Sequence, residues 1–405
     1  MGDRRRAGDP ALDVGAPRER LRDRAGIHLQ LDGPADPRGV RHLSPRDGQR
    51  GGAMKFGLNF FPSFRPSDLS TAAYFDQVLR MCERADQLGY RSVKAVEHYF
   101  HDYGGQTPNP VVLLSAIAAR TRRLRLITGA VIPAFNHPVK LAGELAMLDN
   151  VSGGRLDVGF GRAFIPKEFE VFGISMDESR ARFEEGIDII TRLWTEDRVT
   201  YQGKFHRFND VHSTPRPVQK PHPPIWVAAV MSEESFVAAG RRGDNLMIVP
   251  YAGSVERARD LVRVYRRAWR DAGHPPGAEQ IQVSLHCYVA ETQREAIEGF
   301  RRPLERYVEV FSEALGSWVG HESPQYANYQ KMVQGVISTT PESILENRAA
   351  LVGSPEEVVD QVAMVREAFG EVEPSLQMNF GGMSEREAFR TLELFATRVM
   401  PKFTS

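Results

Sequence analysis

After residue 53, short apolar runs alternate with longer segments whose apolar residues recur every three or four positions. Short runs bounded by Gly or Pro favour buried strands, and the longer repeats favour amphipathic helices. The first run ends at Pro62, and the helical repeat that follows it extends from Tyr74 to Gly89. The pattern predicts eight strands, at residues 54–61, 91–100, 124–129, 156–160, 225–229, 246–249, 281–290 and 375–380.

Strands that alternate with helices at this spacing favour parallel neighbours joined by right-handed crossovers. The predicted fold is therefore an α/β (β/α)8 TIM barrel with insertions. One insertion is a hairpin over 199–208, and another is the aperiodic loop 318–340. A doubly wound open sheet is the alternative, but its usual G-x-G-x-x-G turn does not follow the first strand.

Residues 1–53 differ from the rest of the chain, because they are rich in Arg, Asp, Gly and Pro and show no apolar period. Such a segment buries too little surface to offset the entropy of ordering it. We expect a disordered extension over 1–53 and one barrel domain over 54–405.

The charge balance limits the partners, because 52 Lys and Arg residues offset 52 Asp and Glu residues. No net field favours nucleic acid or a membrane surface, so we expect neither, and a small molecule or another protein is the expected partner. No apolar run is long enough to cross a bilayer. Cys82 and Cys287 lie inside apolar segments without metal-like spacing, which favours reduced core residues in a cytoplasmic protein.

The active site of such a barrel lies at the C-terminal ends of its strands. Few polar groups occupy these positions: there is one histidine, one carboxylate and one arginine, without the acid pair of a glycosidase or the ligand set of a metal site. This scarcity favours a cofactor that brings its own chemistry. The strand-end residues are Asn59, Glu97, His98, Thr128, Gly129, Ala130, Gly161, Arg162, Val230, Met231, Ser232, Pro250 and Asn379.

His98 follows the buried run that begins at Arg91, which makes it a candidate catalytic residue. A core histidine held by the neighbouring Glu97 is the equally open alternative. Met231 and Ser232 begin a helix whose free N–H groups and Ser235 hydroxyl suit a phosphate. Arg162 and Arg180 add charge nearby, although a plain capping box with surface arginines gives the same pattern.

From Met54 to about Phe403 the chain resembles the bacterial luciferase-like, flavin-dependent monooxygenases. The resemblance rests on these strings, taken in order: Met54-Lys-Phe-Gly, Val96-Glu-His-Tyr-Phe, His137-Pro-Val, Met147-Leu-Asp-Asn-Val-Ser-Gly-Gly-Arg-Leu-Asp-Val-Gly-Phe-Gly-Arg162, Ser179-Arg180, Pro224-Ile-Trp-Val-Ala-Ala, Gly353-Ser-Pro-Glu-Glu-Val, Met378-Asn-Phe-Gly-Gly and Val399-Met-Pro.

The resemblance implies a two-component monooxygenase that receives reduced FMN from a separate reductase. The flavin reacts with O2 to give a C4a-peroxyflavin, which oxygenates a small organic substrate. His98 and Glu97 fall on the catalytic positions, with His98 as acid, base or hydrogen-bond partner near the flavin C4a. The resemblance also implies a lid over residues 318–340 and a dimer, expected here as a homodimer, formed by the helices that start at Pro110 and Pro138.

The resemblance further places Arg162, Arg180 and Ser235 on the flavin phosphate. It places a non-prolyl cis peptide between Gly129 and Ala130. Two positions depart from the luciferases, because Tyr99 replaces a second histidine and Gly161 replaces a reactive cysteine. The resemblance therefore does not extend to light emission or to a preference for long-chain aldehydes. Hydride transfer with F420 and a non-catalytic flavin-binding subunit are the alternatives.

Overall fold

The computed structural model describes residues 52–250, 254–326 and 329–404. Eight parallel strands close into a barrel, because β8 pairs with β9 and β11 pairs with β1. Closure confirms the predicted TIM barrel and excludes the open doubly wound sheet. In barrel order the strands are β1 (Gly57–Phe60), β2 (Ser92–Ala95), β3 (Arg125–Thr128), β4 (Leu156–Phe160), β7 (Ile225–Ala228), β8 (Asn245–Ile248), β9 (Ile281–Val289) and β11 (Glu373–Gln377).

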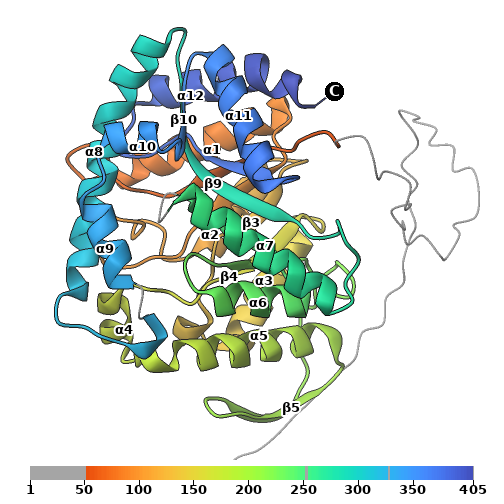
Figure 1. The fold of residues 1–405 in the computed structure, drawn as a ribbon. Helices are drawn as coiled ribbons and strands as arrows, with labels where there is room; N and C mark the ends of the chain where they lie inside the picture. The colour runs from red at the N-terminus through yellow and green to blue at the C-terminus, as the bar shows by residue number, and fades with distance from the viewer. Residues whose placement is uncertain (1–51, 251–253, 327–328, 405) are drawn as a thin grey trace, which may run out of the picture. The chain divides into compact units, whose positions relative to one another are not determined.

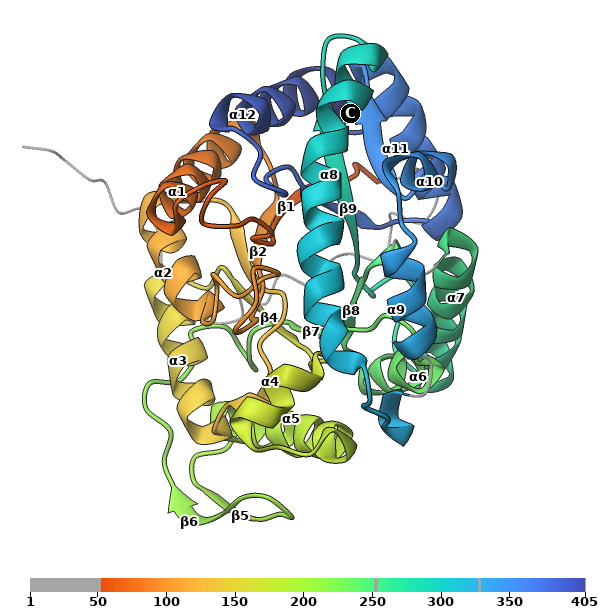
Figure 2. The same ribbon diagram turned by 90° about the vertical axis from the view of Figure 1, so that its left-hand side faces the viewer.

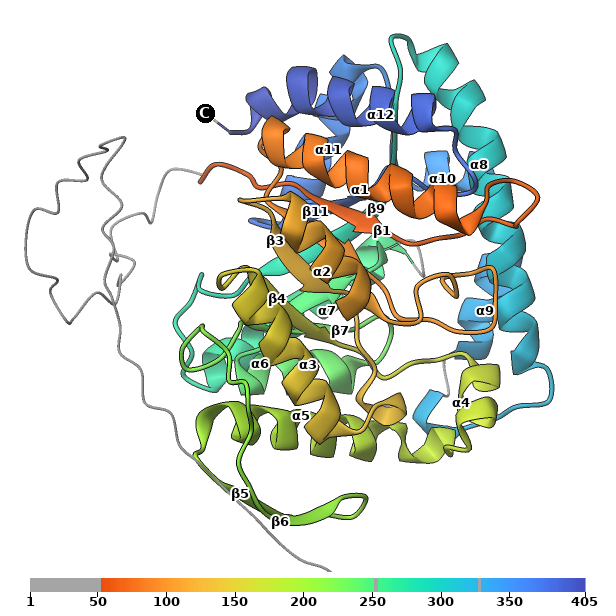
Figure 3. The same cartoon turned by 180° about the vertical axis from the view of Figure 1, so that it is seen from behind.

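Helices cover the outside of the barrel, and α1, α2 and α3 lie side by side on one face (Figures 1 and 3). Local capping explains their ends: the Ser70 side chain caps α1, and Gly89 ends it in the left-handed conformation. The helices are α1 (Thr71–Leu88), α2 (Pro110–Arg120), α3 (Pro138–Val151), α4 (Pro166–Phe172), α5 (Ser179–Thr195), α6 (Glu233–Arg242), α7 (Val255–Asp271), α8 (Gln293–Leu315), α9 (Tyr329–Ile337), α10 (Pro341–Glu346), α11 (Pro355–Phe369) and α12 (Glu385–Leu394).

Three features add detail to the predicted elements. The hairpin insertion is confirmed as β5 (Val199–Gln202) paired with β6 (Arg207–Val211), which lies beyond α5 (Figure 2). The chain also forms β10 (Ala350–Gly353), which the sequence pattern did not predict and which pairs with the C-terminal half of β9. The aperiodic segment 318–340 contains α9, which lies beside α8.

The barrel interior holds a small apolar cluster of Ile127, Ala130, Trp226 and Met247, separate from the larger core under the helices. Cys82 and Cys287 are buried and free, as predicted. Within the described residues, no helix is both long and apolar enough to span a membrane.

The predicted disorder of 1–53 falls mostly on residues 1–51, which lie outside the described part of the chain. Met54 is already buried at 3% exposure, and its N–H donates to the Phe403 carbonyl at 2.9 Å. The two ends of the barrel sequence therefore meet at this hydrogen bond.

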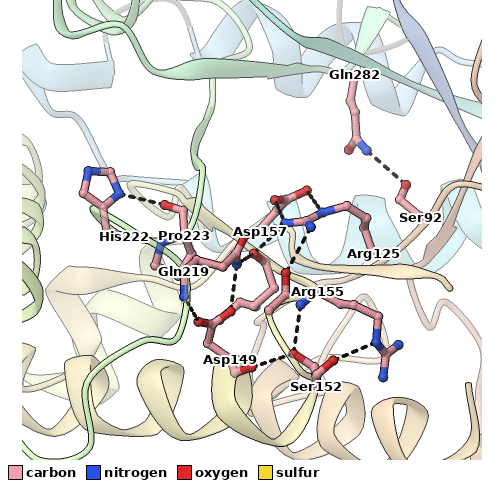
Figure 4. A network of polar contacts seen from close by, with 12 residues as sticks. Ser92, Arg125, Asp149, Ser152, Arg155, Asp157, Gln219, His222, Pro223 and Gln282 are labelled. Carbon is pink, nitrogen blue, oxygen red and sulfur yellow. Dashed lines mark hydrogen bonds and ion pairs between the residues drawn. The ribbon is translucent and has the colours of Figure 1, made fainter. Parts of the chain in front are cut away.

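Polar side chains close the N-terminal end of the barrel (Figure 4). The Arg125 guanidinium forms a two-point ion pair with Asp157, with its Nε 3.0 Å from Oδ2. The same guanidinium donates to the carbonyls of Gly154 and Leu156. Gln219 connects this pair to α3, because its side chain lies 3.2 Å from Arg125 and donates to Asp149 at 2.7 Å.

Candidate active site

A cavity lies at the opposite end, where the strands end. Its empty space is about 1200 Å³, counted to its open mouth. Most of the predicted site residues line it, namely Asn59, Glu97, His98, Gly129, Ala130, Arg162, Met231, Ser232 and Ser235.

Thr128 and Arg180 do not line this cavity. The Thr128 hydroxyl donates to the Gly159 carbonyl at 2.9 Å and accepts from the Gly159 N–H at 2.8 Å, so it fastens β3 to β4. Arg180 lies on α5 and lines a smaller neighbouring pocket of about 290 Å³. Arg162 and Ser235 line both spaces, which makes the smaller pocket an extension of the larger one.

His98 follows β2 and is only 8% exposed. Its Nδ1 lies 3.0 Å from Oε1 of Glu168, and the same oxygen accepts the Tyr99 backbone N–H at 2.9 Å. A carboxylate oxygen that accepts from both groups places the imidazole proton on Nδ1. The Nε2 atom is therefore the ring nitrogen left for a ligand in the cavity.

Glu97 does not hold His98, so that part of the sequence interpretation is wrong. Its carboxylate accepts from the Tyr99 hydroxyl at 2.6 Å, from the Ile132 N–H at 3.1 Å and from Asn136 Nδ2 at 2.9 Å. Burial raises the pKa of Glu97 to about 7, although these donors oppose the rise. Glu97 thus connects the end of β2 to the loop that follows β3 through hydrogen bonds. Tyr99 donates to the same carboxylate and does not line the cavity.

Glu168 is the site residue that the sequence reasoning missed. It lies on the short helix α4 and is 1% exposed. A local signal was present, because Pro166 occupies the first turn and Gly173 ends the helix in the left-handed conformation. The signal predicts the helix, but it does not predict which side chain Glu168 contacts.

Aromatic side chains enclose His98. Its ring centroid lies 5.3 Å from that of Phe61, 5.5 Å from that of Tyr103 and 5.8 Å from that of Phe164. Phe311 of α8 also lines the cavity and stacks on Tyr103 with centroids 4.1 Å apart. These rings give the cavity an apolar wall beside the imidazole.

Arg162 and Arg180 lie at the other side of the cavity, next to the N-terminus of α6. Arg162 Nη2 donates to the Gln325 carbonyl at 3.1 Å, and its guanidinium lies 4.8 Å from the centre of the Tyr326 ring. Arg180 Nη2 lies 3.4 Å from the Ser232 hydroxyl. Ser232 makes no side-chain cap to α6, although its carbonyl accepts the Ser235 N–H at 3.0 Å.

The two arginines have a nearby carboxylate, Glu234, which accepts from the Ser232 hydroxyl and whose pKa is lowered mainly by that hydrogen bond and further by the charges of both arginines. Across the described ranges, neither Arg162 nor Arg180 forms an ion pair, and Arg162 Nη1 is buried without a hydrogen-bond partner. Burial lowers the pKa of Arg180, and the charge of Arg162 lowers it further. Two adjacent guanidiniums at a helix N-terminus fit the doubly charged phosphate of a flavin mononucleotide.

The peptide bond between Gly129 and Ala130 is cis, as the resemblance implies. Gly161 of the next strand lies against it, since a Cβ on Gly161 would be 3.0 Å from the Ala130 Cβ. In the part of the chain that the structure describes, no three His, Cys, Asp or Glu side chains gather as a metal site.

A family model described as luciferase-like monooxygenase matches residues 54–371. The chain belongs to the luciferase-like monooxygenase family. This membership confirms the resemblance found in the sequence, and the named relatives of the chain confirm its enzyme class, a flavin-dependent monooxygenase.

Individual relatives agree with the family. The oxygenase component of the flavin-dependent trigonelline monooxygenase of Acinetobacter baylyi is 31% identical over 369 residues, which are 87% of this chain and 96% of that protein. The crystal structure of monooxygenase RslO1 from Streptomyces bottropensis has a TM-score of 0.77 and 45% identity, and the match covers 86% of this chain and 100% of that chain.

A more distant structure is the oxygenating constituent of 3,6-diketocamphane monooxygenase from Pseudomonas putida, in complex with FMN. It is 23% identical, with a TM-score of 0.72, and the match covers 87% of this chain and 99% of that chain. At this identity the likeness shows the fold alone.

Proposed function

We propose that the protein is the oxygenase component of a two-component monooxygenase, which takes reduced FMN from a separate reductase and transfers one oxygen atom of O2 to a small organic substrate. One observation carries the proposal: the cavity that His98 lines also reaches Arg162, and through Arg162 and Ser235 it adjoins the smaller pocket that Arg180 lines. The relative from Acinetobacter is likewise named an oxygenase component.

Each group has a role that follows from its contacts. Arg162, Arg180 and Ser235 bind the phosphate with the N-terminus of α6. Reduced FMN supplies the two electrons that activate O2. His98 holds or moves a proton at Nε2 because Glu168 fixes its Nδ1.

The remaining predicted residues shape the space around the cofactor. Asn59, Gly129, Ala130, Met231 and Ser232 line the walls that hold the flavin. Glu97 and Thr128 act through the backbone, since the first holds the loop after β3 and the second holds β4.

The aromatic wall points to the class of substrate. Phe61, Tyr103, Phe164 and Phe311 leave an apolar space next to His98, which suits a flat, apolar or aromatic molecule. The segment 318–340, which contributes Tyr329 to the cavity, is proposed as the lid that excludes water during turnover.

We also propose a cytoplasmic homodimer. The helices α2 and α3 expose Val112 at 68%, Met147 at 61% and Val151 at 55%. Exposed apolar side chains on adjacent helices are typical of an interface. Free thiols at Cys82 and Cys287 suit a reducing compartment.

Binding and turnover measurements test the proposed activity. The protein is titrated with FMN and with F420, and then supplied with FMN, NADH, a flavin reductase and O2 in a screen of aldehydes, ketones and aromatic compounds. We expect tighter binding of FMN and a product heavier by one oxygen atom. Tighter binding of F420, or flavin binding without any oxygenated product, would overturn the proposal.

Replacing the imidazole separates binding from chemistry. His98→Ala is expected to bind FMN but to release H2O2 in place of oxygenated product. The matched control is His212→Gln, an exposed histidine in the hairpin region. Oxygenation by His98→Ala with the yield of the unmodified protein would remove His98 from the mechanism.

A further inference from the structure

A buried lysine lies at the floor of the cavity, and none of the roles above uses it. Lys94 is on β2, is 3% exposed and lines the cavity beside Asn59, its partner in the parallel register of β1 and β2. Its aliphatic stem passes under the cis peptide. A Cβ on Gly129 would lie 2.0 Å from the Lys94 Cγ, so only glycine leaves room for the stem.

The Lys94 charge has little compensation. Its Nζ donates to the Ser284 hydroxyl at 2.8 Å, and within the described residues it forms no ion pair. The nearest acid to influence it is Glu373, whose carboxylate accepts from Ser92 and Gln282. Burial lowers the pKa of Lys94 to about 7, and the charge of Glu373 opposes this. An anion in the cavity would restore the ammonium form.

Asn59, next to Lys94, is a second polar residue that a ligand in the cavity could pair with. Its Oδ1 is buried and, among the described residues, has no hydrogen-bond partner. Buried polar atoms are normally paired, so an unpaired acceptor next to an unpaired cation is a costly arrangement. Asn59, Lys94 and Ser284 together form a polar floor in a cavity whose other walls near His98 are aromatic.

The redox states of a flavin differ in charge at the ring. The oxidised ring is neutral, whereas the reduced ring loses a proton near neutral pH and becomes an anion. The phosphate carries the same charge in both states, so Arg162 and Arg180 cannot distinguish them. A cation at the ring can, because charge near the flavin nitrogens tunes its electronics.

We propose that Lys94 is the residue that selects the reduced, anionic flavin over the oxidised flavin. The inference rests on the proposed function, since it assumes that FMN occupies this cavity. Lys94 is then a specificity-determining residue that lets the oxygenase take reduced FMN from its reductase and release it once oxidised. The geometry that carries the proposal is a buried lysine that packs against Gly129, donates to one hydroxyl and lines the cavity next to the unpaired Asn59 Oδ1.

The test measures binding without turnover. Dissociation constants for FMN are determined aerobically for the oxidised form and anaerobically for the reduced form. The chains compared are the unmodified protein, Lys94→Met, Lys94→Gln and the control Lys167→Met, which removes an exposed lysine of α4. Thermal melting confirms that each variant folds, and Lys94→Gln serves if Lys94→Met does not.

We expect the unmodified protein and Lys167→Met to bind reduced FMN at least tenfold more tightly than oxidised FMN. The Lys94 variants should lose at least tenfold in affinity for reduced FMN and less than about twofold for oxidised FMN. Equal weakening of both forms would show a merely structural lysine, and an unchanged preference would also overturn the proposal. If the unmodified protein binds neither form, the proposed function itself fails.

Discussion

Both ends of the barrel contain charged side chains that are buried or partly buried, but among the described residues only the N-terminal end pairs them with opposite charges. At the N-terminal end, the Arg125 guanidinium meets Asp157 and several carbonyl groups, and Asp149 is hydrogen-bonded by Gln219 (Figure 4). At the C-terminal end, Arg162 and Lys94 are buried or partly buried without a carboxylate partner in the described chain.

This difference separates the structural end from the end that binds ligands. Removing a charge from water costs several kcal/mol, which hydrogen bonds and an opposite charge offset. The N-terminal end contains both kinds of compensation. At the cavity a bound anion would offset the cost of burying the positive charges, so these charges favour anion binding there.

The largest expected effect on stability comes from breaking the Arg125–Asp157 ion pair at the N-terminal end of the barrel. Asp157→Ala leaves the partly buried Arg125 guanidinium without its acid, and we expect a loss of about 3 kcal/mol in the free energy of unfolding. Urea denaturation measures the loss. The exposed Asp271→Ala is the control and should change stability by less than about 0.5 kcal/mol.

A double variant sharpens this result. Arg125→Met combined with Asp157→Leu removes both charges, so it should recover a large part of the stability that Asp157→Ala loses. A double variant that is less stable than the single one would show that the pair itself, and not the unpaired charge, determines the stability.

At the cavity, removing a charge is expected to increase the stability of the ligand-free protein. The pKa of Lys94 falls from 10.5 to about 7 on folding. Between these values the unfolded chain binds more protons, so the stability of the ligand-free protein rises with pH. Lys94→Met lacks this cost, so near pH 7 it should be more stable than the unmodified protein, by a gain that shrinks towards pH 10.

Denaturation with urea at pH 7 and pH 10 measures this difference. Ser284→Ala is an informative comparison, because it removes the hydroxyl that accepts from Lys94 and leaves the charge in place. A Lys94→Met protein that is less stable than the unmodified one at pH 7 would contradict the account of Lys94 as an uncompensated charge.

A smaller effect is expected for the phosphate site. Arg162→Met should weaken FMN binding about 30-fold, near 2 kcal/mol, because charge-assisted hydrogen bonds contribute about this much. The ligand-free protein should not lose stability, since Arg162 has no acid to leave behind. Fluorescence titration and urea denaturation measure the two quantities, with the exposed Arg294→Met as control. If Arg162→Met lost as much free energy of unfolding as free energy of FMN binding, Arg162 would have a structural role and the prediction would be wrong.

The barrel could be predicted from the sequence because the spacing of apolar residues within each strand and helix indicates which side of that element is buried. Apolar runs such as 156–160 and caps such as Ser354 with Glu357 act over a few residues, and the structure has both. Strand ends then indicated His98 and Arg162. The strand β10 escaped prediction because it is an addition to the alternating pattern of the barrel: it follows the short helix α10 and, among the described strands, pairs only with β9.

The sequence by itself determined the order of the elements and which residues lie at the cavity end of each strand. Only the tertiary structure decided their partners. Glu168, 70 positions from His98, holds the imidazole, whereas the adjacent Glu97 turns to the loop after β3. Glu97 and His98 both follow β2 and both line the cavity, yet their hydrogen-bond partners come from different segments of the chain. Contacts across the barrel depend on how distant segments pack, and no local pattern records that packing.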